Sequence, residues 1–168
     1  MKTPKVTIAL INPKTVTNVG AVMRAAGCYR VDAVIYSGTR YDRAAKMQTD
    51  TKDRRQNIPL TGVDDLLAHL PANAKLVCVE LAEGATPLPE YHHPENAMYV
   101  FGPEDGTISQ AIIDQADAVV YVPTVGCMNL AATVNVVLYD RLAKSGLTIA
   151  GDALIRQSRD TNNTLKVR

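Results

Sequence analysis

Short apolar segments alternate with helical patterns along most of the chain, and this alternation constrains the fold more than any other feature. Five segments are apolar or β-branched throughout, as is typical of strands buried on both faces of a sheet: 6–11, 33–37, 75–81, 98–101 and 118–122. Four segments between them have helical periodicity: 19–28, 63–70, 108–115 and 130–144. The alternation predicts an α/β domain with a mostly parallel sheet flanked by helices.

Two longer stretches interrupt this alternation. Residues 38–59 are charged and weakly periodic, and so long a connection in a compact domain is usually functional or mobile. Residues 81–96 form a second, proline-rich loop, in which we expect His92 and His93 to be solvated rather than to bind a metal. Residues 1–150 are expected to form one domain, followed by a polar, loosely ordered tail at 151–168.

Three widely spaced cysteines, Cys28, Cys78 and Cys127, fit neither a disulfide framework nor a zinc site. Reduced thiols in a cytosol are the better interpretation. The apolar run near the N-terminus is too short for the core of a signal peptide, and no later stretch is long enough to span a membrane. We therefore expect a cytoplasmic protein without a membrane partner.

The charge is balanced overall but not locally. The 168 residues carry 18 basic and 17 acidic side chains, whereas a dedicated nucleic-acid-binding domain usually has a clear basic excess. Within residues 40–55, however, basic side chains outnumber acidic ones: Arg40, Arg43, Lys46, Lys52, Arg54 and Arg55. Any contact with a polyanion is expected in this segment.

The last predicted helix, 130–144, is apolar on two faces. One face carries Leu130, Val134, Val137, Leu138 and Leu142, and the other carries Ala132, Val136, Tyr139 and Ala143. The sheet covers one face, and the other needs either a second subunit or burial within the same domain. In so short a chain we favour a homodimer through this helix.

The first of three motifs, residues 12–28, follows the first predicted strand, at the sheet edge where ligands of open α/β folds bind. Asn18 is expected to cap a helix, and Gly20 and Ala21 leave space beside Arg24. The fork of an arginine suits a phosphate or a carboxylate. The alternative is a surface arginine or an internal ion pair.

The second motif, residues 99–109, leads from a strand into a turn with two glycines, Gly102 and Gly106, which permit close approach of a ligand to the backbone. Glu104 and Asp105 make this turn acidic, which disfavours a phosphate and favours a cationic ligand or an arginine. The alternative is that the two carboxylates complement a helix dipole.

The third motif, residues 119–142, contains a strand that ends at Pro123 and a helix that begins near Asn129. An asparagine is costly to bury without a hydrogen-bond partner. Asn129 therefore caps the helix, holds the preceding loop, or does both.

Together and in this order, the three motifs resemble those of the SpoU/TrmH branch of the SPOUT RNA 2′-O-ribose methyltransferases. The first family motif is matched by Asn18, Gly20 and Arg24, the second by the FGPEDG segment at 101–106, and the third by Pro123 and the Met-Asn-Leu sequence at 128–130. The resemblance extends over nearly the whole chain, which is similar to the minimal, single-domain members.

This resemblance implies a fold and a cofactor. The implied fold has a C-terminal trefoil knot, which no spacing argument would suggest. The implied cofactor is S-adenosylmethionine, bound without a metal and converted to S-adenosylhomocysteine. Its contacts are expected from nine residues: Glu80, Leu81, Phe101, Gly102, Val122, Cys127, Met128, Asn129 and Leu130. Cys127 stands where the family usually has a serine, and the loop at 123–129 is shorter than usual.

The resemblance also implies catalytic roles. Arg24 is expected at the reacting ribose, oriented by Asn18 and Glu104, with Tyr139 reaching the site of a partner subunit. Because a guanidinium keeps its proton at neutral pH, we favour Arg24 as a phosphate clamp that stabilises developing negative charge, rather than as a base. The basic residues of segment 40–55 are expected to contact the RNA backbone.

The sequence therefore predicts an S-adenosylmethionine-dependent methyltransferase that acts on a ribose 2′-hydroxyl of tRNA, including the wobble nucleotide, or of rRNA. Two alternatives remain. A non-catalytic RNA-binding homologue is favoured by Cys127 and the short loop, and an unrelated α/β enzyme for a small nucleotide is favoured by the near-neutral charge.

Overall fold

A seven-stranded sheet forms the centre of the computed structural model, which describes residues 5–47, 58–147 and 149–168. The strand order is β3-β2-β1-β6-β4-β7-β5, and all described pairings are parallel. The strands are β1 (Val6–Leu10), β2 (Ala33–Tyr36), β3 (Leu60–Gly62), β4 (Lys75–Val79), β5 (Thr86–Pro87), β6 (Ala97–Phe101) and β7 (Ala118–Tyr121). The predicted parallel α/β architecture is confirmed; the trefoil knot stays a prediction.

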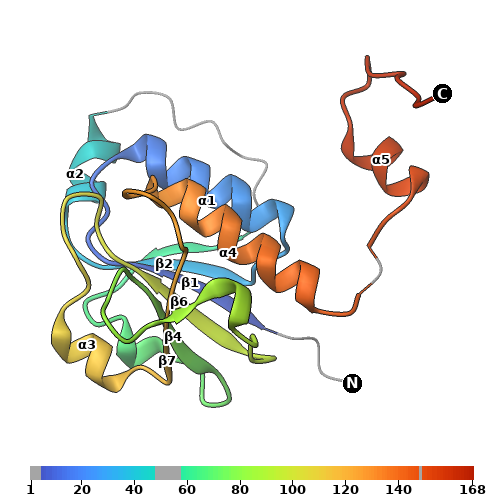
Figure 1. Ribbon diagram of the computed structural model, residues 1–168. Coiled ribbons are helices and arrows are strands. Elements are labelled where there is room, and N and C mark those ends of the chain that lie inside the picture. The colour runs from blue at the N-terminus through green and yellow to red at the C-terminus, as the bar shows by residue number, and fades with distance from the viewer. Residues whose placement is uncertain (1–4, 48–57, 148) are drawn as a thin grey trace.

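Helices cover both faces of the sheet (Figure 1). On one face α1 (Val16–Cys28) and α4 (Leu130–Lys144) lie side by side, and α3 (Gln110–Gln115) and the 3₁₀ turn η1 (Leu67–His69) lie on the other. The short helix α2 (Arg40–Lys46) follows β2, the 3₁₀ turn η2 (Leu88–Glu90) follows β5, and α5 (Asp152–Ser158) lies apart from the sheet. Within the described ranges, no helix has both the length and the apolar character needed to cross a membrane.

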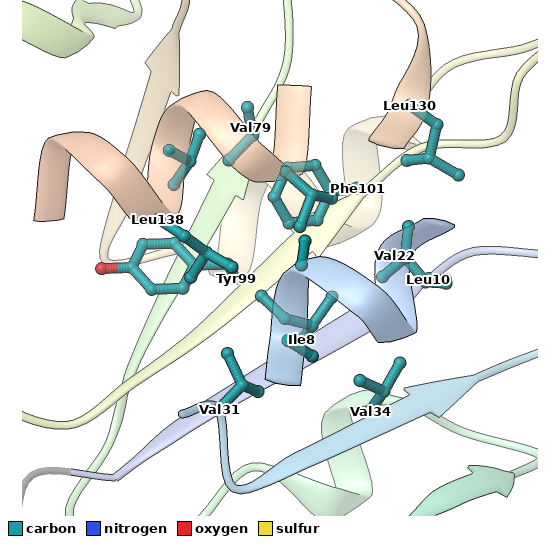
Figure 2. Packing of buried hydrophobic residues seen from close by; sticks show 14 of the residues in the cluster. Ile8, Leu10, Val22, Val31, Val34, Val79, Tyr99, Phe101, Leu130 and Leu138 are labelled. Carbon is teal, nitrogen blue, oxygen red and sulfur yellow. The ribbon is translucent and has the colours of Figure 1, made fainter. Parts of the chain in front are cut away.

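Alternation along the central strands builds a core on each face of the sheet, because successive residues of a strand point to opposite sides. Tyr99 and Phe101 of β6 pack with Leu138 and Leu130 of α4, as Figure 2 shows. Met98 and Val100, which alternate with them along β6, belong to the opposite cluster, together with Ile108 and Leu66. Burial on both sides explains why these strands are apolar throughout rather than alternating.

The boundaries of α1 differ from the prediction in a way that matters for the site. Thr15 caps this helix, and its hydroxyl oxygen accepts a hydrogen bond from the backbone N–H of Asn18 at 3.2 Å. The predicted cap at Asn18 is therefore wrong. Asn18 lies in the first turn instead, which leaves its side chain available for another contact.

Other elements also differ from the sequence-based expectations. The segment predicted as a helix at 63–70 contains only η1, whose three residues are followed by an extended Leu70. The polar stretch at 38–59 contains α2, and the polar tail contains α5; neither helix was predicted. Lys52, Arg54 and Arg55 lie outside the described residues.

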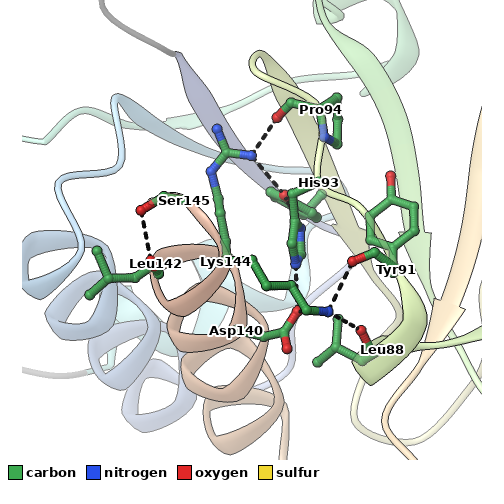
Figure 3. A network of polar contacts seen from close by, with 10 residues as sticks. Leu88, Tyr91, His93, Pro94, Asp140, Leu142, Lys144 and Ser145 are labelled. Carbon is green, nitrogen blue, oxygen red and sulfur yellow. Dashed lines mark hydrogen bonds and ion pairs between the residues drawn. The ribbon is translucent and has the colours of Figure 1, made fainter. Parts of the chain in front are cut away.

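A polar cluster holds the second half of α4 to the loop before β6 (Figure 3). Nδ1 of His93 lies 2.7 Å from the Tyr99 hydroxyl, and its Nε2 lies 2.7 Å from the Asp140 carboxylate. Lys144 pairs with Asp140 at 2.9 Å, and Arg141 donates to the Tyr99 hydroxyl. Lys144 and Arg141 also donate to loop carbonyls, those of Leu88, Tyr91, Pro94 and Glu95.

The expected solvation of His93 is wrong, since its side chain is only 5% exposed. Burial lowers the pKa of His93, and the neighbouring Asp140 opposes this shift. The adjacent His92 is exposed, as expected. Local sequence does not distinguish these two histidines, because the partners of His93 come from β6 and α4, which are distant along the chain.

Candidate functional site

A pocket opens beyond the carboxyl ends of β4, β6 and β7, beside the first turn of α4. All the predicted cofactor residues except Asn129 line it: Glu80, Leu81, Phe101, Gly102, Val122, Cys127, Met128 and Leu130. The predicted catalytic residue Glu104 also lines it. The remaining lining residues are Val79, Pro103, Gly106, Tyr121, Thr124 and Thr133. Segments far apart in sequence meet here because parallel strands end at the same edge.

Glu80 organises the floor between β4 and β6. One carboxylate oxygen accepts a hydrogen bond from the backbone N–H of Leu81 at 2.8 Å, and the other accepts from the N–H of Ile108 at 3.0 Å. A Cβ on Gly102 would lie only 3.2 Å from the nitrogen of Ile108 and 3.3 Å from the Glu80 carboxylate. Glycine at 102 therefore lets the chain pass close to this hydrogen-bonded pair.

The pocket wall is acidic. Glu80 and Glu104 are the charged side chains among the described residues that line it, and both are carboxylates. Glu104 also accepts a hydrogen bond from the backbone N–H of Lys14, at 2.8 Å, which ties the wall to the loop after β1. Such a wall favours a cationic group on a ligand.

Asn129 both caps α4 and contacts the first motif. Its side-chain oxygen accepts hydrogen bonds from the backbone N–H groups of Ala131 and Ala132, at 2.9 and 3.3 Å. Its Nδ2 donates to Oδ1 of Asn18 at 3.1 Å. The two roles left open by the sequence therefore coexist, and the contact brings the start of α1 to the edge of the pocket.

Arg24 and Tyr139 lie elsewhere on the subunit. Neither is among the described residues that line the pocket, and both are exposed, Tyr139 by 61%. Arg24 follows Asn18 by six residues, about 9 Å further along α1. Tyr139 lies near Tyr29, whose pKa is raised by burial first, then by Cys28 and Tyr139. Within one subunit, the structure does not bring these two predicted catalytic residues to the pocket.

The described part of the basic segment divides into two kinds of residue. Arg43 and Lys46 are exposed on α2. Arg40 instead forms a two-point ion pair with Asp105, with N–O distances of 2.8 and 3.0 Å. This guanidinium lowers the pKa of the Asp105 carboxyl. The internal ion pair that the sequence analysis considered for Arg24 is thus found at Arg40.

Sequence reasoning did not identify Thr133, which lines the pocket one helical turn after Asn129. Its hydroxyl donates to the backbone carbonyl of Asn129 at 2.9 Å. Helical spacing from Asn129 was a sufficient signal for this residue. Tyr121 and Thr124 also line the pocket. They lie on either side of the predicted Val122, at and just beyond the end of β7, and neither was predicted.

Comparison with known proteins places this geometry in a family. The model of the SpoU rRNA Methylase family matches residues 5–139. The chain belongs to the SpoU rRNA methylase family. The match includes the first strand, all the strands that end at the pocket, and most of α4.

The relatives of this SpoU methylase chain include a curated protein and several solved structures. The chain is 29% identical over 132 residues to the 23S rRNA (guanosine-2′-O-)-methyltransferase RlmB of Acinetobacter baylyi, covering 73% of this chain and 53% of that protein. It therefore spans about half the length of this curated relative.

Two structures illustrate the shared SpoU fold. The SpoU methyltransferase AviRb from Streptomyces viridochromogenes, in complex with the cofactor AdoMet, matches with a TM-score of 0.66 at 16% identity, over 86% of this chain and 59% of that chain. A structure described as giving insights into the 2-OH methylation of C/U34 on tRNA matches with a TM-score of 0.70 at 20% identity, over 86% of this chain and 93% of that chain.

Proposed function

We propose that this protein is an S-adenosylmethionine-dependent methyltransferase that acts on a ribose 2′-hydroxyl of RNA. The proposal is carried by the acidic pocket, which two of the family motifs line and the first motif reaches through Asn18 and Asn129. It is supported by the AdoMet complex of AviRb and by the 2′-O-methyltransferase activity named for RlmB.

The residues of the pocket fit this cofactor chemically. Glu80 and Glu104 supply negative charge for a ligand that carries a sulfonium and an ammonium group. Leu81, Val122 and Leu130 supply apolar surface for its nucleoside part. When bound, S-adenosylmethionine supplies an electrophilic methyl group. Backbone contacts remain available at Cys127, although the usual serine hydroxyl is absent there.

The protein's own residues bind and align the ribose. In our proposal Arg24 holds the phosphate next to the target nucleotide and stabilises the negative charge that develops on the 2′-oxygen. Asn18 and Glu104 orient the ribose or Arg24 at the edge of the pocket. Holding these groups in register removes much of the entropic barrier to a displacement at carbon.

Arg24 and Tyr139 act in the pocket of a second subunit in this proposal. Both lie on the outer surface of α1 and α4, beside Ala21, Ala132 and Val136, and Val136 is 37% exposed. A twofold homodimer through this surface buries the surplus apolar face of α4 and carries Arg24 towards the partner's pocket. The position of Arg24 on the outside of its own subunit then has a functional reason.

The proposed RNA is a tRNA, with the wobble nucleotide as the first position to test. The support is the structure concerned with C/U34 of tRNA, 93% of which is covered by this chain. The rRNA substrate named for RlmB is the second candidate. Arg43 and Lys46 on α2, with Lys52, Arg54 and Arg55 of the same segment, are the proposed contacts with the RNA backbone.

The proposed location is the cytoplasm. Cys28, Cys78 and Cys127 are free thiols, which suits a reducing compartment, and the proposed RNA substrates are found there.

Mass spectrometry of methylated RNA tests the proposed function. The protein is incubated with bulk RNA and S-adenosylmethionine carrying a deuterated methyl group, and the RNA is digested to nucleosides. Labelled 2′-O-methyl nucleosides are expected, and their absence from tRNA and rRNA alike would contradict the proposal. Calorimetric titration with S-adenosylmethionine separates the alternatives, since binding without turnover indicates a non-catalytic homologue and no binding indicates a different enzyme.

A further inference from the structure

The guanidinium of Arg40 joins two loops at the pocket. Towards the loop after β6, its Nη1 and Nη2 donate to the two carboxylate oxygens of Asp105, at 2.8 and 3.0 Å. Towards the loop after β1, its Nη2 and Nε donate to the backbone carbonyl of Asn12, at 2.7 and 3.2 Å. Four of the five N–H donors of an arginine are thereby used in fixed directions.

The loop after β6 forms part of the pocket wall. Gly102, Pro103, Glu104 and Gly106 line the pocket, whereas Asp105 between them pairs with Arg40. Glu104 is bound from the same side by the backbone N–H of Lys14. The wall is therefore held through two neighbouring carboxylates.

The loop after β1 is the second segment that Arg40 binds, through the backbone carbonyl of Asn12. Asn12 has a left-handed backbone, with φ of 41°, and its N–H donates weakly to the Ser37 hydroxyl at 3.4 Å. Three residues later Thr15 caps α1, the helix that carries Asn18 to the pocket edge. The position of this turn thus affects where the first motif begins.

We infer that Arg40 is a positioning residue, which sets the pocket wall at 102–106 against the loop that carries the first motif. This inference rests on the proposed function, since it concerns the cofactor pocket. It also replaces the expected role of Arg40 as an RNA contact, because the side chain is only 28% exposed and its fork is already bound. Lysine cannot take this role, since an ammonium group lacks the planar fork that spans both acceptors.

Calorimetry with S-adenosylmethionine, and separately with S-adenosylhomocysteine, tests the inference on the full chain. R40A, R40K and D105N are each expected to weaken binding by about fivefold or more, the scale of a lost charge-assisted hydrogen bond. R156A, at an exposed arginine of α5, is the matched control and should leave affinity unchanged. In R40A combined with D105N, the losses should not add, because each single change already breaks the pair.

The salt dependence of RNA binding separates positioning from RNA contact. R40A should leave the slope of log affinity against log salt unchanged. R43A should reduce the magnitude of this slope by about one, the loss of one phosphate contact. Unchanged cofactor affinity in both R40A and D105N, or a slope that falls in R40A as in R43A, overturns the inference.

Hydrogen exchange keeps the inference testable apart from the proposed function. If the parent protein binds no S-adenosylmethionine, the proposed function fails, but Arg40 still joins the two loops. R40A should then speed exchange in both segments 12–14 and 102–106, with R156A unchanged. Parent-like exchange in R40A contradicts the positioning role.

Discussion

The side chains of Asn18 and Asn129 meet at the edge of the pocket, with Nδ2 of Asn129 donating to Oδ1 of Asn18 at 3.1 Å. These residues are separated by 111 positions in the chain, and they bring the first turns of α1 and α4 together. Asn129 has two further bonds as the cap of α4, whereas Asn18 has its own helix capped by Thr15. The two amides therefore differ in how much of the fold depends on them.

This difference predicts unequal effects on stability. N129A should lower the free energy of unfolding by about 1 kcal/mol, the usual effect of losing a helix cap. N18A removes only one partly exposed hydrogen bond and should change it by less than about 0.5 kcal/mol. Urea denaturation followed by circular dichroism measures both. Equal losses would mean that capping is not what distinguishes the two residues.

Gly102→Ala should weaken the binding of S-adenosylmethionine. The added methyl group would press on the nitrogen of Ile108 and the carboxylate of Glu80, at 3.2 and 3.3 Å, and would shift the floor of the pocket. Gly27→Ala in α1 is the matched control, because its methyl group meets nothing within 4 Å and helix propensity favours alanine. Calorimetry should give lower affinity for G102A alone. Parent-like affinity in G102A would show that the close approach at Gly102 is not required.

Arg24→Ala should abolish methylation while leaving cofactor affinity within a few-fold of the parent, because Arg24 does not line the pocket. If Arg24 serves the partner's site, mixing R24A with G102A protein should restore activity through heterodimers, at a concentration of S-adenosylmethionine too low for G102A alone to give turnover. Random exchange of subunits makes about half of the dimers mixed, and each mixed dimer has one intact site out of two. The expected activity is therefore about a quarter of that of the parent. Activity assays before and after exchange measure this recovery.

No recovery after verified subunit exchange would place Arg24 in the site of its own subunit. Parent-like turnover of R24A alone would remove it from catalysis altogether. The second outcome is read directly from the labelled nucleosides and needs no mixing.

Val136→Glu should convert a homodimer into monomers, since it places a charge on the exposed apolar surface of α4. Leu165→Glu, at a side chain that is 81% exposed in the tail, is the control for an added charge on an exposed apolar residue. Analytical ultracentrifugation over a concentration series measures the mass of each. The prediction would be contradicted by a parent protein that is already monomeric, or by a V136E variant that remains dimeric.

The buried His93 predicts a loss of stability in mild acid. Because burial lowers the pKa of His93 in the folded protein, the unfolded chain takes up a proton first as the pH falls below about 6.5. The free energy of unfolding should therefore decrease between pH 7.5 and 5.5, until His93 in the folded protein is protonated as well. The charged groups around His93 act on its pKa in opposite directions. Asp140 favours the protonated ring, whereas Arg141 and Lys144 disfavour it.

Denaturation of H93Q and H92Q at both pH values tests this assignment. H93Q should lose part of the decrease, and H92Q, at the exposed neighbour, should keep it. If the decrease is the same in all three proteins, His93 is not its source.

The fold was predictable where local sequence and global packing agree. The central strands and α4 follow directly from apolar runs and helical spacing, because both elements are buried and their patterns are strong. Helix α2 was missed since none of its residues is buried, so no apolar periodicity marks it. The η1 segment has apolar residues at helical spacing but forms only one 3₁₀ turn.

The candidate site was predictable to the level of strand ends. Family motifs located two stretches of the pocket lining, within 101–106 and 127–130, because the lining residues there are close together in sequence. Tyr121, Thr124 and Thr133, which also line the pocket, were not singled out. The pairing of Arg40 with Asp105, which are 65 positions apart, was not predictable, since it depends on how two loops meet in space. The expected capping by Asn18 failed for a local reason, as Thr15 is also a favoured cap and stands three residues earlier.

Because α1 and α4 run parallel, partial positive charge and negative charge lie in different parts of the site. Both helices begin at the Asn18–Asn129 contact, so each directs the positive end of its dipole to the same edge of the pocket. The carboxylates of Glu80 and Glu104 form the neighbouring wall. Backbone and side chains thus create adjacent zones of opposite potential, one suited to an anion and the other to a cation, before any ligand arrives.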